Sequence, residues 1–304
     1  MFDVKDVSDW EVADVIEAVG TKPKIWLRDH GGDLWLFKSL RKRAPEPSGE
    51  DWAEKAVCEI ATLLGVPRPT TELAHRNESR GVISRNFVRD GASLVHGNEL
   101  LSAKDPEYPQ GQRSNDTPGY TVAAAFNALE GIAAPGGIEG ELTLTPEATA
   151  CDWFAGYLVL DAWVNNTDRH HMNWGVVKPD GTLTPSFDHG SSLAFGETED
   201  RRASLLADNA ALTRWLEKGR TKPFEGMPSM VDVAADGLSM CPELYRNFWI
   251  DSIEHIDQVA IDKIIDDIPE SGPVGPILSD TARTLCKEIL RINRERVLSV
   301  VESD

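Results

Sequence analysis

One short segment, residues 165–188, constrains the fold of this chain more than any other part of it. The segment reads NNTDRHHMNWGVVKPDGTLTPSFD. Its apolar run WGVV predicts a strand, the PDG turn reverses the chain, and a second strand follows. Such a hairpin brings Asn173, at its entrance, close to Asp188, at its exit, and Asp168 lies in the loop before it. The sequence therefore predicts that two acids and an amide converge at one edge of the structure.

The residue types in this segment indicate phosphoryl transfer. Carboxylate and amide oxygens suit Mg²⁺, which keeps several waters and shares the phosphates of its substrate. In kinases one Asp accepts the proton of the attacking hydroxyl, while an Asn and a second Asp hold magnesium on the phosphates. The spacing D-x-x-x-x-N, followed by a hairpin and then a further D, is the pattern of a kinase catalytic loop. Here the pattern runs from Asp168 to Asn173 and then to Asp188.

The front of the chain predicts the cation that such a site needs. Residues 24–38 read KIWLRDHGGDLWLFK, which predicts two strands joined by a glycine turn, with Lys38 at the end of the second strand. The next helix is expected to begin at Ser48 as N-cap, with Asp51 completing a capping box. Glu54 then lies at the edge of the apolar stripe of this helix. Lys38 and Glu54 supply the lysine–glutamate ion pair expected opposite the acids.

The order of the elements predicts an α+β fold of two lobes. The strands belong to a small N-lobe, residues 1–90, and a larger helical C-lobe follows over residues 91–304, with a cleft between them. Residues 145–164 are largely apolar and predict a buried helix directly before the catalytic segment. Residues 102–120 are rich in Pro, Gly, Asp and Ser and predict a mobile loop. Further helices are expected around residues 203–218, 242–268 and 279–301.

Charge and composition limit the partners that the chain is expected to have. Fifty acids against 31 bases give a net charge of -19, which disfavours nonspecific binding to nucleic acids and anionic membranes. No apolar run approaches the ~18 residues of a membrane span, and the start MFDVKDVSDWEV lacks the apolar stretch of a signal peptide. We therefore expect a cytoplasmic protein with no direct nucleic-acid or membrane partner. Four widely spaced cysteines without a CxxC pair are expected to be reduced thiols: Cys58, Cys151, Cys241 and Cys286.

These motifs resemble a known family. DRHHMNWGVV followed by FDHG, and preceded by FAGYLVLDAWVNNT, resembles the HipA-like serine/threonine kinases, bacterial proteins best known as toxins of toxin–antitoxin pairs. The resemblance extends to GTKPKIWLRD and LWLFK at the front and to LVHGNELL at residues 94–101. It implies a bilobal protein-kinase-like fold that uses ATP and Mg²⁺. It also implies a protein substrate with a Ser or Thr acceptor, autophosphorylation, and an antitoxin protein as partner.

The same resemblance implies a role for each residue of the site. Asp168 would be the catalytic base, and Asn173 and Asp188 would be the magnesium ligands. Lys38 would be the lysine that binds the phosphates of the nucleotide. Glu54 matches the helix glutamate that pairs with this lysine.

A nucleotide loop is also implied near the start of the chain. Gly20, Thr21 and Lys22, within the run GTKPK, stand where HipA-like kinases have a short basic loop. The run differs from the usual kinase glycine loop, because no G-x-G-x-x-G occurs near the start. We expect these three residues to cover the phosphates.

Other functions stay open from the sequence. D-R-H-x-x-N followed by D-H-G also occurs in phosphatidylinositol kinases, and small-molecule kinases of the aminoglycoside phosphotransferase type share the fold. The negative charge and the lack of an apolar anchor disfavour a membrane substrate. The WGVV and LVHGNELL blocks favour the HipA-like family. The non-enzyme alternative is a pseudokinase that binds nucleotide and acts as a partner-binding module.

Overall fold

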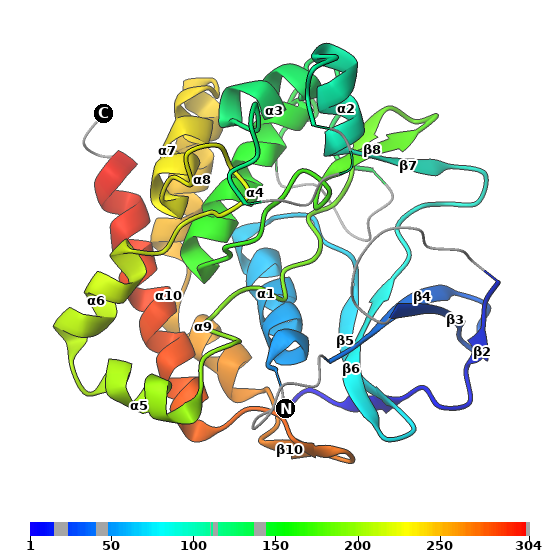
Figure 1. The fold of residues 1–304 in the computed structure, drawn as a ribbon, viewed down its shortest axis with the longest axis vertical. Coiled ribbons are helices and arrows are strands. Elements are labelled where there is room, and N and C mark those ends of the chain that lie inside the picture. Colours follow the sequence, from blue (N-terminus) through cyan, green and yellow to red (C-terminus); the bar gives the residue numbers. More distant parts are fainter. Residues whose placement is uncertain (15–23, 41–47, 110, 112–114, 137–143, 302–304) are drawn as a thin grey trace.

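The computed structural model describes residues 1–14, 24–40, 48–109, 111, 115–136 and 144–301. A curled six-stranded sheet forms one side of the molecule (Figure 1), in the order β1-β5-β6-β4-β3-β2. Strands β1 and β5 pair in parallel, and the other neighbours pair antiparallel. The strands are β1 (Val4–Asp6), β2 (Glu11–Val12), β3 (Lys24–Arg28), β4 (Leu34–Ser39), β5 (Thr71–Arg76) and β6 (Ser79–Arg85).

Strand β4 shows how side-chain alternation positions the site. Trp35 and Phe37 point into a small apolar core that they share with Leu27 and Ile83. Successive side chains of a strand face opposite sides of the sheet, so Lys38 lies on the face away from this core. That face lines the cavity between the sheet and the helical part of the molecule.

Helix α1 (Glu50–Leu64) lies between the sheet and the other helices (Figure 1) and contacts β5, β6 and α9. The expected N-cap was wrong: Gly49, not Ser48, occupies the cap, and no side chain caps it. Asp51 does not complete a capping box, because its carboxylate pairs with Arg80, whose Nε lies 2.7 Å from Asp51 Oδ2. A long-range ion pair therefore replaces the local cap and ties the helix to the sheet.

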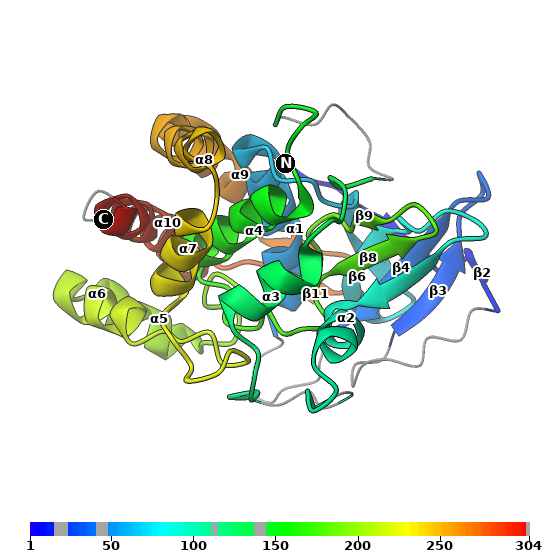
Figure 2. The same ribbon diagram turned by 90° about the horizontal axis from the view of Figure 1, so that it is seen from above.

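Helix α4 (Ala150–Val164) is the centre of the C-lobe. Every residue of α4 except Cys151 is buried, as the apolar sequence predicted. Figure 2 shows α4 between the sheet on one side and α7, α8 and α10 on the other. The remaining helices are α2 (Gly97–Lys104), α3 (Val122–Leu129), α5 (Glu199–Leu206), α6 (Asn209–Glu217), α7 (Met230–Ser239), α8 (Glu243–His255), α9 (Gln258–Asp266) and α10 (Asp280–Val301).

The hairpin predicted after α4 is present but shorter than expected. Strand β8 (Gly175–Lys178) pairs antiparallel with both β7 (Ser93–His96) and β9 (Thr182–Leu183). Strand β9 ends at Leu183, so Asp188 lies in an irregular segment beyond it. A further two-stranded sheet joins β10 (Ser271–Gly272) to β11 (Gly275–Pro276).

Two of the expected long helices are each broken in two. The pattern over 203–218 is divided between α5 and α6, because the Asp208 carboxylate accepts the N–H groups of Ala210 and Ala211 and starts a new helix. The pattern over 242–268 is divided in the same way, with Asp257 capping α9. The apolar periodicity of the sequence continues through both breaks. The N-capping residues Asp208 and Asp257 mark where the second helix begins in each case.

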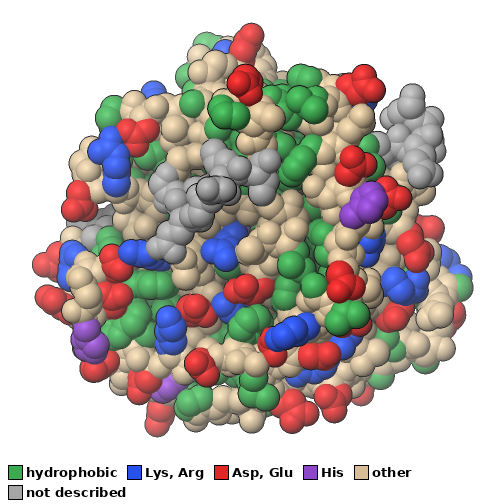
Figure 3. All heavy atoms as spheres, turned by 180° about the vertical axis from the view of Figure 1, so that it is seen from behind, with side chains coloured by type: hydrophobic (Ala, Val, Ile, Leu, Met, Phe, Trp, Pro, Cys, Tyr) green, Lys and Arg blue, Asp and Glu red, His purple; other side chains and the backbone are tan. Residues whose placement is uncertain are grey.

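Negative charge is dispersed over one face of the molecule. On the face opposite to that of Figure 1, acidic side chains are spread over the surface with basic ones among them (Figure 3). Within the described residues, no helix is both long and apolar enough to span a bilayer.

Candidate active site

Lys38, Glu54 and Asp188 come together from three separate elements. The Lys38 Nζ lies 3.0 Å from Asp188 Oδ1 and 3.9 Å from Glu54 Oε2. The Glu54 side chain is only 5% exposed, so its charge needs the nearby ammonium to offset the cost of burial. The structure therefore places the predicted lysine between the helix glutamate and the second acid.

The backbone around Asp188 is unusual in two ways. Asp188 has a φ of 61°, in the left-handed region that few residues other than glycine adopt. Two residues later, a Cβ at Gly190 would lie 3.1 Å from the Glu50 carbonyl oxygen and 3.3 Å from Glu54 Oε2. Glycine at this position lets the segment after Asp188 pack directly against α1.

The catalytic loop predicted from the sequence follows α4 after a sharp turn. Asn165 ends the helix in the left-handed conformation, which Asn tolerates well. The Asp168 carbonyl oxygen then accepts hydrogen bonds from His170 N and Asn173 Nδ2, both at 2.8 Å. Because the Asn173 amide nitrogen is engaged in this way, its oxygen is the end of the side chain that can bind a cation. The loop thus holds Asp168 and Asn173 in one turn.

A buried arginine joins the parts of the site, and the sequence did not predict it. Arg169 Nε and Nη2 donate to the two oxygens of Asp161, at 2.6 and 2.7 Å. Its Nη1 donates to the carbonyl oxygens of Asn173, at 2.9 Å, and Phe187, at 3.3 Å. Burial disfavours the charged guanidinium, but the ion pair with Asp161 outweighs it and raises the pKa of Arg169. One guanidinium therefore brings Asn173 close to the residue that precedes Asp188.

His189 is a buried, neutral neighbour of the site. It is buried, with Nε2 2.7 Å from Ser186 Oγ and Nδ1 3.9 Å from Glu54 Oε1. Burial, together with the nearby charge of Arg169, lowers the pKa of His189 to about 3. The imidazole is therefore uncharged at neutral pH and acts by hydrogen bonding.

Two tyrosines from the segment predicted as a mobile loop hold the catalytic loop. Tyr108 Oη lies 2.6 Å from His171 Nδ1. Tyr120 Oη donates to the Arg169 carbonyl oxygen, at 3.0 Å, and accepts from Trp174 Nε1, at 2.9 Å. Both tyrosines are buried. The described part of that segment is therefore a support of the site, which a reading based on its Pro and Gly content missed.

A cavity of about 590 Å³ opens between the sheet and the C-lobe, and both Lys38 and Asp188 line it. The rings of Phe87 and Phe187 contact each other in its wall, with centroids 5.4 Å apart. The size and the largely apolar wall are typical of a pocket for a small organic ligand. Other apolar side chains of the wall include Trp26, Leu34, Leu36, Val88 and Leu94.

Three predicted nucleotide-binding residues, Gly20, Thr21 and Lys22, lie outside the described residues. The strand that follows them, β3, begins at Lys24, which pairs in register with Lys38 of β4. The start of β3 thus lies beside the lysine of the site.

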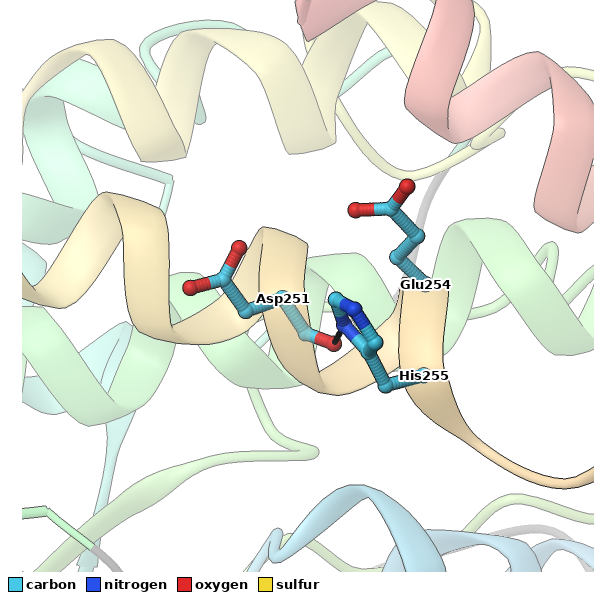
Figure 4. A group of neighbouring side chains, drawn as sticks. All are labelled: Asp251, Glu254 and His255. Atoms are coloured by element: carbon cyan, nitrogen blue, oxygen red, sulfur yellow. Dashed lines mark hydrogen bonds between the residues drawn. The ribbon is translucent and has the colours of Figure 1, made fainter.

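A second group of potential ligands lies away from this cavity. Asp251, Glu254 and His255 are exposed on α8, and their ligand atoms lie within 4.8 Å of one another (Figure 4). The Nδ1 atom of His255 is 2.8 Å from the Asp251 carbonyl oxygen of its own helix. Exposed acidic groups at helical spacing are common without a metal, so this group by itself does not indicate a metal site, and magnesium binding by Asn173 and Asp188 stays a prediction.

The fold and this arrangement define a protein of the protein-kinase-like class. More particularly, the model of the HipA-like C-terminal domain matches residues 16–236, and the chain belongs to that family. The resemblance inferred from the sequence motifs is thereby confirmed. No curated protein sequence matches this chain.

Solved structures agree with the predicted fold class. The proinflammatory kinase CtkA of Helicobacter pylori matches with a TM-score of 0.74 and 18% identity, over 99% of this chain and 97% of that one. HipA of Shewanella oneidensis, solved in a toxin–antitoxin complex with HipB and operator DNA, matches with a TM-score of 0.58 and 14% identity. That match covers 97% of this chain and 68% of HipA. The bilobal protein-kinase-like α+β fold is therefore confirmed, and family and fold together support a kinase function.

Proposed function

We propose that this protein is an ATP- and Mg²⁺-dependent protein kinase that phosphorylates Ser or Thr hydroxyls. The observation that carries the proposal is the position of the Lys38 ammonium, 3.0 Å from Asp188 in the wall of the 590 Å³ cavity. Binding of a nucleoside triphosphate with its metal requires a lysine for the phosphates and an acid for the metal ion, and Lys38 and Asp188 supply these two groups. The apolar wall of the same cavity suits the adenine base.

The donor set fits magnesium. The amide oxygen of Asn173 and the carboxylate of Asp188 are hard oxygen ligands, and Arg169 donates both to the backbone of Asn173 and to that of Phe187, the residue before Asp188. Bound Mg²⁺ would neutralise charge on the phosphates. Lys38 would bind the phosphates from the other side, with Glu54 keeping its ammonium in place.

In the proposed reaction the hydroxyl oxygen of the acceptor attacks the γ-phosphorus of ATP. A new P–O bond to the acceptor forms, the bond to the β-phosphate oxygen breaks, and ADP leaves. Asp168 orients the hydroxyl and receives its proton. General-base catalysis of this kind contributes about 10²–10⁴-fold to the rate.

The test is transfer of labelled γ-phosphoryl from ATP with Mg²⁺ to a panel of acceptors. The panel holds casein, the protein itself, phosphatidylinositol vesicles and an aminoglycoside, and acid hydrolysis of labelled protein identifies the phosphorylated residue. Label on Ser or Thr supports the proposal. Label on the lipid or the aminoglycoside would support the corresponding kinase instead, and nucleotide binding without transfer to any acceptor would support a pseudokinase.

A second proposal, that the protein is the toxin of a toxin–antitoxin pair, is favoured by one observation. This is the match to Shewanella HipA over 97% of the chain, because that protein was solved with HipB. An antitoxin protein would then be a partner. Induced expression in a bacterial host tests this role: the wild type should arrest growth and Asp168→Ala should not.

A further inference from the structure

Lys222 lies directly beside the catalytic loop. Its backbone N–H donates to the Thr167 carbonyl oxygen, at 3.3 Å, and Thr167 is the residue before Asp168. Lys222 belongs to the segment 218–229, which joins α6 to α7. The segment therefore lies next to the backbone that carries Asp168.

The position of Lys222 is fixed by the packing around it. Its carbonyl oxygen accepts from Asp116 N, at 2.7 Å, and Thr117 N donates to the Pro223 carbonyl oxygen, at 3.0 Å. Phe224 is 1% exposed, and its ring stacks on that of Tyr120 with centroids 4.2 Å apart. Because Tyr120 Oη also donates to the Arg169 carbonyl oxygen, the segment and the catalytic loop pack against the same buried side chain.

Three of the side chains that this segment presents to solvent are basic, beside the exposed Glu225 and Met227. Lys218, Arg220 and Lys222 are all exposed. Two nearby acids are held by backbone N–H groups: Asp116 Oδ1 accepts from Gly226 N at 2.6 Å and Glu225 Oε2 accepts from Gly119 N at 3.0 Å.

The three basic side chains differ in how they are held. Arg220 Nη1 donates to the carbonyl oxygens of Glu217 and Gly219. Lys222 Nζ makes no hydrogen bond or ion pair with the residues that the structure describes. The same holds for Lys218, but Lys222 is the residue of the three whose backbone bonds the catalytic loop, at Thr167.

We propose that Lys222, assisted by Lys218 and Arg220, selects acceptor peptides with Asp or Glu next to the phosphorylated Ser or Thr. The inference rests on the proposed function and adds a substrate class to it. An exposed ion pair of this kind changes binding by about two- to fivefold, and salt weakens it. The selection is therefore a preference, and it is strongest at low ionic strength.

The experiment is a phosphorylation assay on a library of peptides with one central Ser or Thr and each flanking position varied. The wild type is compared with Lys222→Glu and with Lys104→Glu. The latter makes the same charge change at an exposed residue of α2 and controls for net charge. Lys222 is exposed and its side chain has no described partner, so its replacement should leave the fold intact, which circular dichroism verifies.

We expect the wild type and Lys104→Glu to phosphorylate peptides with flanking acids about two- to fivefold faster than matched alanine peptides, with the preference lost in high salt. Lys222→Glu should abolish or reverse it. Equal rates for acidic and alanine peptides in the wild type, or an unchanged preference in Lys222→Glu, would overturn the inference alone. Transfer to no peptide, and none to the protein itself, would overturn the proposed function and the inference with it.

Discussion

Arg169 and Asp161 form a two-point ion pair in the interior of the C-lobe, with N–O distances of 2.6 and 2.7 Å and both side chains almost fully buried. Asp161 lies on α4, whereas Arg169 directly follows the proposed base Asp168. The same guanidinium also donates to the carbonyl oxygen of Asn173 and to that of Phe187, which precedes Asp188. The geometry of the site therefore depends on one buried acid outside the cavity.

The first prediction concerns this acid. Asp161→Asn leaves the Arg169 charge buried without a full partner, which should lower the free energy of unfolding by about 3–5 kcal/mol. Urea denaturation measures the loss, and phosphoryl transfer should fall as well. Asp152→Asn is the matched control, because Asp152 is a buried acid of the same helix that caps its N-terminus. Asp152→Asn should lower the free energy of unfolding by about 1 kcal/mol and leave the rate of phosphoryl transfer unchanged.

A second prediction tests the tyrosine that holds the catalytic loop. Tyr120→Phe removes the hydroxyl between Trp174 Nε1 and the Arg169 carbonyl oxygen, and leaves a buried N–H unsatisfied. Stability should fall by about 1–3 kcal/mol, and kcat should fall while the KM for ATP stays unchanged. Tyr157→Phe is the control, since its buried hydroxyl donates to Thr184 instead. A similar drop in kcat for both variants would show that Tyr120 has no special relation to the loop.

The third prediction concerns the charges in the cleft. Lys38→Met leaves the Glu54 carboxylate buried beside Asp188 without its cation. It should abolish transfer and also destabilise the protein by several kcal/mol, on the order of a broken buried ion pair. Adding Glu54→Gln should restore much of the stability but none of the activity. Strictly additive losses in the double variant, measured by urea denaturation, would contradict coupling between the two side chains.

The fourth prediction is that the cysteines of the folded protein react slowly. Burial raises the pKa of the Cys58 thiol to about 11 and that of the Cys286 thiol to about 12, so little of the reactive thiolate exists at pH 8. With an ordinary thiol pKa of 9.0, the thiolate fraction of Cys58 should fall by about 100-fold on folding. Iodoacetamide labelling followed by mass spectrometry should therefore modify both only after unfolding. Rapid labelling of either thiol in the native protein would refute the burial.

Much of the site could be predicted because its residues are near one another in sequence. Asp168, Asn173 and Asp188 lie within one loop and hairpin, where turn signals and strand alternation set the geometry. Lys38 and Glu54 needed only the period of one strand and one helix. Local patterns therefore located these five side chains, although their catalytic roles stay predictions.

The parts that sequence reasoning missed all depend on contacts between distant segments. The sequence places Asp51 where a capping box has an acid. In the structure its carboxylate instead forms an ion pair with Arg80 of β6. Tyr120 lies at the end of a segment with the composition of a loop, yet packing against the catalytic loop buries it. Lys222 reaches Thr167 through a fold-dependent backbone contact. No local period or motif encodes such pairings.

The most direct test of the central claim is intact-mass analysis after incubation with ATP, Mg²⁺ and casein, for the wild type beside Asp168→Ala. We predict a gain of one or more phosphate groups on the chain or on casein with the wild type, and none with the variant. The same gain with Asp168→Ala would contradict the assignment of the base. Absence of any gain with the wild type, on either protein, would contradict the proposed kinase activity itself.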